Sequence, residues 1–140
     1  MPDSPKVEFA PELAEAMTGA CHCLSARKWA RRLTRLYDEH LSEHGLTIGQ
    51  FGIMTTMAWR GGASLQELAD ALDLDQSALS RGLAPLERDG LVVSSADRRD
   101  GRRRLLSLSE RGLAKLSAAA KSWKAAQDAA ERKMAARGKA

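Results

Sequence analysis

Residues 61–112 carry the sequence GGASLQELADALDLDQSALSRGLAPLERDGLVVSSADRRDGRRRLLSLSERG, and this stretch decides the fold. Two groups of apolar residues recur in it at helical spacing, namely Leu65, Leu68, Ala69 and Leu72, followed by Leu79, Leu83 and Leu86. Each group follows a residue type that caps helices, Ser64 for the first and Asp75 for the second. Glu67 completes an S-x-x-E capping box with Ser64. We therefore predict two short helices joined by a tight turn.

The second predicted helix has a polar face that suits DNA. Small and amide side chains stand on its leading turn with an arginine one turn behind, a pattern typical of a helix inserted end-first into the major groove. Pro85, with Gly82 nearby, removes a backbone hydrogen bond and crowds the carbonyl of Arg81, so we expect a kink that confines base contacts to the preceding turn. The candidate DNA-binding residues of this part are Ser64, Gln76, Ser77, Ser80, Arg81 and Arg88.

The hydrophobic period changes after Asp89-Gly90. Residues 91–93 and 105–108 are short apolar runs, and the polar segment between them favours a loop, so the pattern predicts a β-hairpin, or wing. Residues 97–104 contain five arginines and two aspartates, a local balance of +3. Such a density of charge on an exposed tip favours phosphates opposite it.

The composition of the whole chain limits the possible functions. A chain of 140 residues, 44% of them hydrophobic, has room for one domain or for a protomer that completes its core with a partner. The formal net charge of +4 indicates nucleic acid only weakly, and the clustering of arginine is the stronger sign. The 4% aromatic content argues against a single-strand binder built on base stacking.

The chain shows no sign of a membrane segment. No apolar run approaches the roughly 18 residues that a membrane helix needs, and the first twelve residues are acidic and rich in proline, unlike a signal peptide. We expect a cytoplasmic protein without membrane partners. Cys21 and Cys23 are then expected to be free thiols, pointing in different directions from one helix.

Long helical patterns flank the central stretch. Residues 13–46 repeat apolar side chains at steps of three and four, with Gly19 as a possible break and Gly45 as the end, and Thr47 with Gln50 caps an internal helix that contains Phe51, Ile53, Met54, Met57 and Ala58. Ser109 caps a last helix from Glu110 to about Arg137, with an apolar seam of Leu113, Leu116, Ala120, Trp123, and Ala126 or Ala130. An alanine-rich helix buries little alone, which favours pairing with a second copy.

These patterns predict a mainly α fold with a small β-hairpin wing (α+β), a winged helix-turn-helix with N- and C-terminal dimerisation helices. The predicted organisation is a flexible N-terminal arm over 1–12, dimerisation helices over 13–46, to which the family resemblance described next adds an effector pocket, a DNA-binding lobe over 47–108, and a C-terminal dimerisation helix over 109–140.

The chain resembles the MarR family of bacterial transcriptional regulators in three pieces, LTIGQFGIM, LQELADALDLDQSALSRGLAPLERDGLV and DGRRRLLSLSERG, which together cover about residues 20–130. The last piece is similar to the family's wing signature, with Asp100 two residues before Arg102. The resemblance implies a homodimer on palindromic double-stranded DNA, with Asp100 orienting the wing and Arg102 entering the minor groove.

Electrostatics supports this assignment independently. A narrow minor groove attracts an inserted arginine, and an adjacent carboxylate can hold the guanidinium in one orientation. The remaining arginines of the loop are candidates for phosphate contacts, which position without specifying sequence, and these are Arg98, Arg99, Arg103 and Arg104.

The first long helical segment contains the candidates for sensing an effector. Cys23 precedes Tyr37 by fourteen residues, a spacing similar to that of the family's organic-hydroperoxide sensors, although the second tyrosine of such sensors would fall at Ile48. Three interpretations of Cys23 stay open: a small buried residue, a redox sensor and a residue lining a pocket. Trp29 and Trp59 are predicted in the core. Family members that bind aromatic or acyl molecules imply an effector site including Arg27, Trp29, Tyr37 and Trp59.

We therefore predict a homodimeric, sequence-specific transcriptional regulator, a repressor in the simplest case, that responds to a small molecule or an oxidant. The alternatives are a winged-helix module that binds another protein and a thiol-based redox regulator using Cys23. The sequence shows no nucleophile–base pair, no phosphate-binding glycine loop and no metal-ligand spacing, so we expect no enzyme activity, cofactor or metal.

Overall fold

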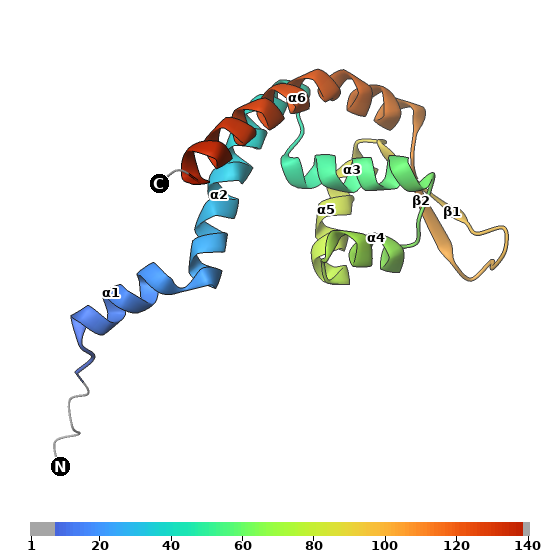
Figure 1. Ribbon diagram of the computed structural model, residues 1–140. Helices are drawn as coiled ribbons and strands as arrows, with labels where there is room; N and C mark the ends of the chain where they lie inside the picture. Colours follow the sequence, from blue (N-terminus) through green and yellow to red (C-terminus); the bar gives the residue numbers. More distant parts are fainter. Residues whose placement is uncertain (1–7, 139–140) are drawn as a thin grey trace, which may run out of the picture. The chain divides into compact units, whose positions relative to one another are not determined.

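The computed structural model of the protein describes residues 8–138 (Figure 1). The described residues form two compact units, which divide between Arg35 and Leu36. Residues 1–7 of the predicted flexible arm lie outside the described residues. None of the described helices is long and apolar enough to cross a membrane.

The first unit holds helix α1 (Pro11–Ala20) and most of helix α2 (His22–Leu41). Helix α1 begins at Pro11, two residues before the predicted position. Proline is favourable there because the first backbone N–H groups of a helix have no acceptor within the helix, so the N–H that proline lacks is not needed. The break falls at Cys21, which is extended with φ −69° and ψ 112°, and not at the predicted Gly19. A glycine inside a helix costs only about 1 kcal/mol, which this helix tolerates. Cys21 and Cys23 therefore do not share one helix, contrary to the prediction.

The second unit is built around helix α3 (Ile48–Arg60), whose start carries the predicted capping box between Thr47 and Gln50. Four of the five residues predicted to be internal are buried, and Ala58 is exposed instead. Helix α2 ends at Leu41, and the turn before left-handed Gly45 is the short 3-10 helix η1 (Ser42–His44) where we predicted continuous α-helix.

Helices α4 (Leu65–Leu72) and α5 (Gln76–Arg88) pack with α3 to form the predicted helix-turn-helix. Their apolar faces enter the core as expected, with Leu68, Ala69, Leu79, Leu83 and Leu86 buried. A Cβ on Gly82 would lie 2.9 Å from Cδ1 of Ile53, so the missing side chain lets α5 approach α3 closely. Pro85 lies inside α5 and does not end the helix, which continues to Arg88.

Strands β1 (Val92–Ala96) and β2 (Arg104–Leu108) form the predicted antiparallel hairpin, with Val92 opposite Leu108 and Ala96 opposite Arg104. The first strand extends past the predicted apolar run, because its ladder needs only the backbone of the exposed residues Ser94 and Ser95. Ala63 exchanges two backbone hydrogen bonds with Leu106, and these join the hairpin to the segment before α4.

Helix α6 (Glu110–Gly138) is capped by Ser109, as predicted. Its inward seam is Gly112, Leu116, Ala119, Trp123, Ala126 and Ala130, at alternating steps of four and three. The predicted members Leu113, which is 50% exposed, and Ala120 face outward. The reason is Gly112: a Cβ there would lie 2.1 Å from the carbonyl oxygen of Leu91, so only glycine can touch that backbone, and its position sets the rotation of the helix.

Candidate nucleic-acid interface

Helix α5 presents its leading turn to solvent. Asp75 caps it by accepting a 2.7 Å hydrogen bond from the backbone N–H of Ala78. The apolar side of the helix lies in the core, and the predicted base-contacting side chains are all exposed: Gln76, Ser77, Ser80 and Arg81. Arg88 is exposed at the other end of the helix. The leading turn is therefore available to a large ligand while the core side holds the helix in place.

Gln76 is held by a side chain of the preceding helix. Its Nε2 donates to Oε1 of Gln66, and Nε2 of Gln66 donates to Oδ1 of Asp70 at 2.8 Å. The sequence analysis did not single out Gln66 or Asp70. Their spacing of four residues, which brings an amide and a carboxylate together on a helix surface, could have indicated half of this arrangement.

Two aspartates fold the tip of the wing through its backbone. Oδ1 of Asp97 accepts from the N–H of Arg99 at 2.9 Å, and Oδ1 of Asp100 accepts from the N–H of Arg102 at 3.1 Å. Two further backbone hydrogen bonds close the loop, from Asp97 to Arg103 and from Arg103 to Asp100. Asp100 thus orients the backbone of Arg102, whereas the prediction had its carboxylate holding the guanidinium.

The arginines of the wing have two different environments. The guanidinium of Arg103 donates to the Ser64 hydroxyl at 2.9 Å and also binds the Glu67 carboxylate, an arrangement that we call the wing clamp. Arg104 donates to Oγ and to the backbone oxygen of Ser94, within the hairpin. Both arginines were predicted to contact phosphates, and each is already engaged.

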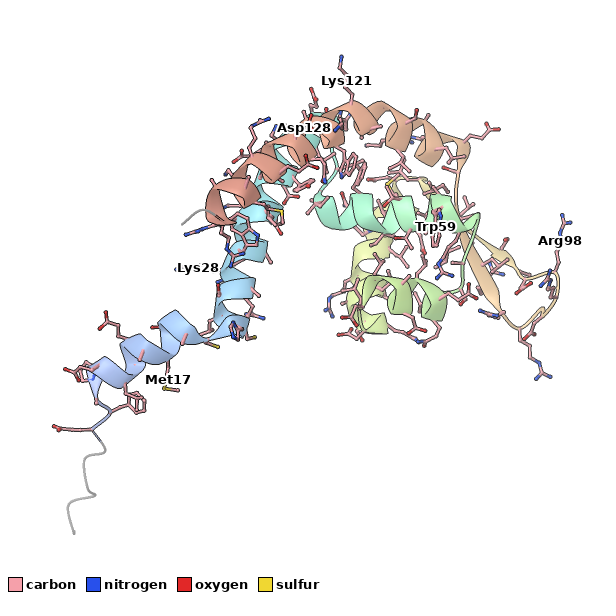
Figure 2. All side chains as sticks on the ribbon, viewed as in Figure 1. Met17, Lys28, Trp59, Arg98, Lys121 and Asp128 are labelled. Carbon is pink, nitrogen blue, oxygen red and sulfur yellow. The ribbon has the colours of Figure 1, made fainter. Side chains whose placement is uncertain are left out.

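The other three wing arginines, Arg98, Arg99 and Arg102, are exposed, and their guanidinium groups make no hydrogen bond or ion pair within residues 8–138. Figure 2 shows Arg98 at the loop tip, pointing away from the helices. These cations are therefore free to meet an anionic surface.

The wing clamp also changes the role of two helix-cap residues. Ser64, a predicted DNA-binding residue, is buried, accepts from the backbone of Glu67 at 3.2 Å and receives Arg103 as well. Glu67 does not close the predicted capping box, since its carboxylate turns to Arg103, with Arg60 3.9 Å away. Both residues position the wing from α4.

A groove of about 480 Å³ joins the start of α5 to the wing. It is lined by residues of α4, α5 and the hairpin, namely Ser64, Leu65, Gln66, Gln76, Arg102, Arg103 and Arg104. Segments more than 25 residues apart in the sequence thus present amide and cationic side chains to one concave surface, which is the arrangement needed to contact base edges and backbone together.

The predicted effector residues are divided between the two units. Cys23 and Arg27 are exposed on α2 and Trp29 is half-buried, all in the first unit, so Cys23 is not the small buried residue of one interpretation. Trp59 is 82% exposed, with the Arg60 guanidinium 5.8 Å from its ring centre, so its core assignment was wrong. The last turn of α3 extends beyond the core, and Trp123 of α6 instead stacks on Phe51 with ring centres 6.2 Å apart.

Tyr37 lies in the second unit and donates its hydroxyl hydrogen to Oε1 of Gln127 on α6. Burial, followed by the negative charge of Glu131, raises the pKa of the Tyr37 phenol, which therefore remains a neutral donor. Among the described residues, no group of three His, Cys, Asp or Glu side chains could hold a metal ion.

Comparison with known proteins finds some that resemble this chain in sequence and some that resemble it in fold. The chain is 31% identical over 91 residues to a putative transcriptional regulatory protein for the hcr operon of Thauera aromatica, a match covering 65% of this chain and 51% of that protein. The match thus spans about half the length of this curated relative.

Two solved structures share most of the fold. A probable transcriptional regulator from Pseudomonas aeruginosa has a TM-score of 0.75 at 25% identity, over 86% of this chain and 94% of that one. The transcriptional regulator MOSR of M. tuberculosis, solved with DNA, has a TM-score of 0.70 at 29% identity, over 85% and 94%. Residues 44–103, which include α3, the helix-turn-helix and the wing loop, match the model of the MarR family. Residues 44–103 therefore carry the helix-turn-helix and wing of the MarR family, in a chain that shares its fold with these transcriptional regulators.

Proposed function

We propose that the protein is a sequence-specific transcriptional regulator that binds double-stranded DNA as a homodimer. The observation that carries this proposal is the groove shared by Gln76 and Arg102, which places an exposed helix end and a free cation on one surface. The relative solved with DNA has the same fold at 29% identity, which supports the same ligand class.

Each exposed element has a role in this proposal. The leading turn of α5 contacts base edges in the major groove through Gln76, Ser77, Ser80 and Arg81. Arg102 enters the minor groove, and the unpaired Arg98 and Arg99 bind phosphates. Arg103 and Arg104 hold the wing in place through protein contacts.

A dimer follows from the size of the DNA-contacting surface. One copy offers one recognition helix and one wing, which contact one half-site, and two copies related by a two-fold axis contact a palindrome. The exposed apolar residues Phe9, Leu13 and Met17 of the first unit supply a surface that a second copy would cover.

The simplest regulatory action is repression, in which the bound dimer blocks transcription and an effector releases it. A ligand or oxidant that favours a different spacing of the two recognition helices by a few kcal/mol would be sufficient. Screening aromatic acids and peroxides against the DNA complex, with Cys23→Ser as control, identifies the effector class.

Footprinting on the DNA upstream of the protein's own coding sequence tests the proposal. We expect protection of two half-sites separated by roughly one helical turn, or about 34–36 Å, and an affinity that falls steeply with salt. Equal binding to all sequences would contradict a sequence-specific regulator. It would favour the alternative, a winged-helix module whose arginines bind an acidic protein.

A further inference from the structure

The side chains of Asp70, Gln66 and Gln76 form a line of hydrogen bonds that we call the amide relay. The relay begins on α4 and ends on the first residue of α5, and Gln66 and Gln76 both line the groove beside the wing. All three side chains are exposed, so burial in the core does not fix their orientation. Their mutual hydrogen bonds are therefore what orients them.

The carboxylate of Asp70 determines which way the hydrogen bonds of the relay run. An ionised carboxylate only accepts hydrogen bonds, whereas an amide has one accepting and one donating end. Asp70 must therefore face the NH₂ of Gln66, which turns the Gln66 oxygen toward Gln76. Gln76 must then offer its own NH₂ to Gln66, so its carbonyl oxygen is free to face away. The two ends of an amide have nearly the same shape, so without Asp70 either orientation would fit.

We propose that the amide relay sets the base preference of the recognition helix. Asp70, acting through Gln66, holds Gln76 with its carbonyl oxygen toward the DNA, where it accepts from an exocyclic amino group. Adenine and cytosine carry such a group in the major groove, and guanine and thymine offer oxygen acceptors instead. The second hydrogen of Gln76 Nε2 can reach N7 of adenine, so adenine is the favoured partner. This inference rests on the proposed DNA-binding function.

The relay gains its importance when DNA arrives. In the free protein, water can satisfy either end of an exposed amide, so orientation matters little. Binding removes that water, and an amide turned the wrong way leaves two donors or two acceptors facing each other, which costs more than an ordinary hydrogen bond contributes. Asp70 and Gln66 are positioning residues in this scheme, because they act on the base only through Gln76.

Selection by the full-length protein from a duplex DNA library with a randomised central segment tests the relay. Gln76→Ala identifies the position that Gln76 contacts, because its preference is lost there. Gln66→Lys provides only donors, so it turns the Gln76 oxygen inward and its NH₂ outward. We expect the preference at that position to change from adenine or cytosine to guanine or thymine, by about tenfold or more in relative affinity. Gln66→Glu provides only acceptors and should keep the wild-type preference.

Comparing bases within one variant cancels the effect of net charge on overall affinity. Asp73→Asn is the matched control, since it shifts the charge of the α4 end by the same single unit as Gln66→Lys and lies outside the relay. Asp70→Lys imposes a donor on Gln66 and serves as a second inverting variant if Gln66→Lys does not fold.

The outcomes separate the inference from the proposed function. An unchanged base in both inverting variants, or no position sensitive to Gln76→Ala, overturns the relay while sequence-specific binding stands. A wild-type protein that enriches no sequence contradicts the proposed function itself, and the relay with it.

Discussion

Arg102 and Arg103 are neighbours in the sequence, yet their guanidinium groups have different surroundings. Arg103 binds Ser64 and Glu67, whereas the Arg102 side chain has no such partner among the described residues. Both residues belong to the turn that precedes β2, so strand alternation does not set where their side chains point. Asp100 fixes the backbone of Arg102 through the N–H at 3.1 Å and leaves the guanidinium free. The arginine suited to DNA is therefore the one without a protein partner.

Replacing Arg102 by Ala should weaken DNA binding by about 1 to 3 kcal/mol without lowering the melting temperature, because the side chain makes no contact that supports the fold. Electrophoretic mobility shift titrations together with thermal melts measure both effects. Lys121→Ala removes one positive charge from the outer face of α6 (Figure 2) and is the control for net charge. Equal losses in the two variants would mean that Arg102 contributes only bulk charge.

At the scale of elements, the wing is joined to the helix-turn-helix at two levels. Backbone hydrogen bonds of 3.0 and 2.8 Å pair Ala63 with Leu106 at its base, and the wing clamp connects Arg103 to the first turn of α4. The side chains of Arg103 and Glu67 are 47% and 39% exposed, so their ion pair contributes about 1 kcal/mol or less to stability. Its larger effect is on geometry, because it keeps the loop beside the start of α5.

Replacing Arg103 by Lys should loosen the wing, since one ammonium group cannot match the guanidinium fork that contacts a hydroxyl and a carboxylate together. We expect faster hydrogen exchange of the amides in residues 97–103 and a loss of DNA affinity of up to about tenfold. The control is Arg104→Lys, because Arg104 bonds to Ser94 within the hairpin. If exchange in the loop is the same in the two variants, the clamp does not hold the wing.

At the scale of the second unit, the start of α6 is fastened to the end of α5. Ser109 donates to the carbonyl oxygen of Gly90 at 2.6 Å and accepts from the N–H of Gly112 at 3.0 Å. The backbone N–H of Ser109 also donates to the oxygen of Leu91. The start of the long helix is thus held by hydrogen bonds from Ser109 to Gly90 and Leu91, in the segment that follows α5.

Gly112→Ala should destabilise the protein by about 1 to 3 kcal/mol, because the new Cβ would lie 2.1 Å from the Leu91 carbonyl oxygen and force the joint apart. Chemical denaturation measures the change. Gly101→Ala is the control, since a Cβ there meets nothing within 4 Å. A stability equal to that of the control would show that α6 can shift without strain at this contact.

The sequence by itself determined the features that depend on near neighbours. The caps at Thr47, Ser64, Asp75 and Ser109 and the change of period after Gly90 could be predicted because each involves residues within about four positions, where helix and turn geometry is local. The same patterns identified the surface that carries the candidate site.

Only the tertiary structure decided which side chains of that surface have no protein partner among the described residues. The wing clamp joins residues 36 and 39 positions apart, and the Gln66–Gln76 hydrogen bond of the amide relay crosses from one helix to the next, so no periodicity could indicate these contacts. The contact of Gly112 with Leu91 places Gly112 and Ala119 in the seam of α6 instead of the predicted Leu113 and Ala120, and Trp59 lies outside the core because the last turn of α3 extends beyond the core. Each of these outcomes depends on where a distant backbone lies, which local propensities do not specify.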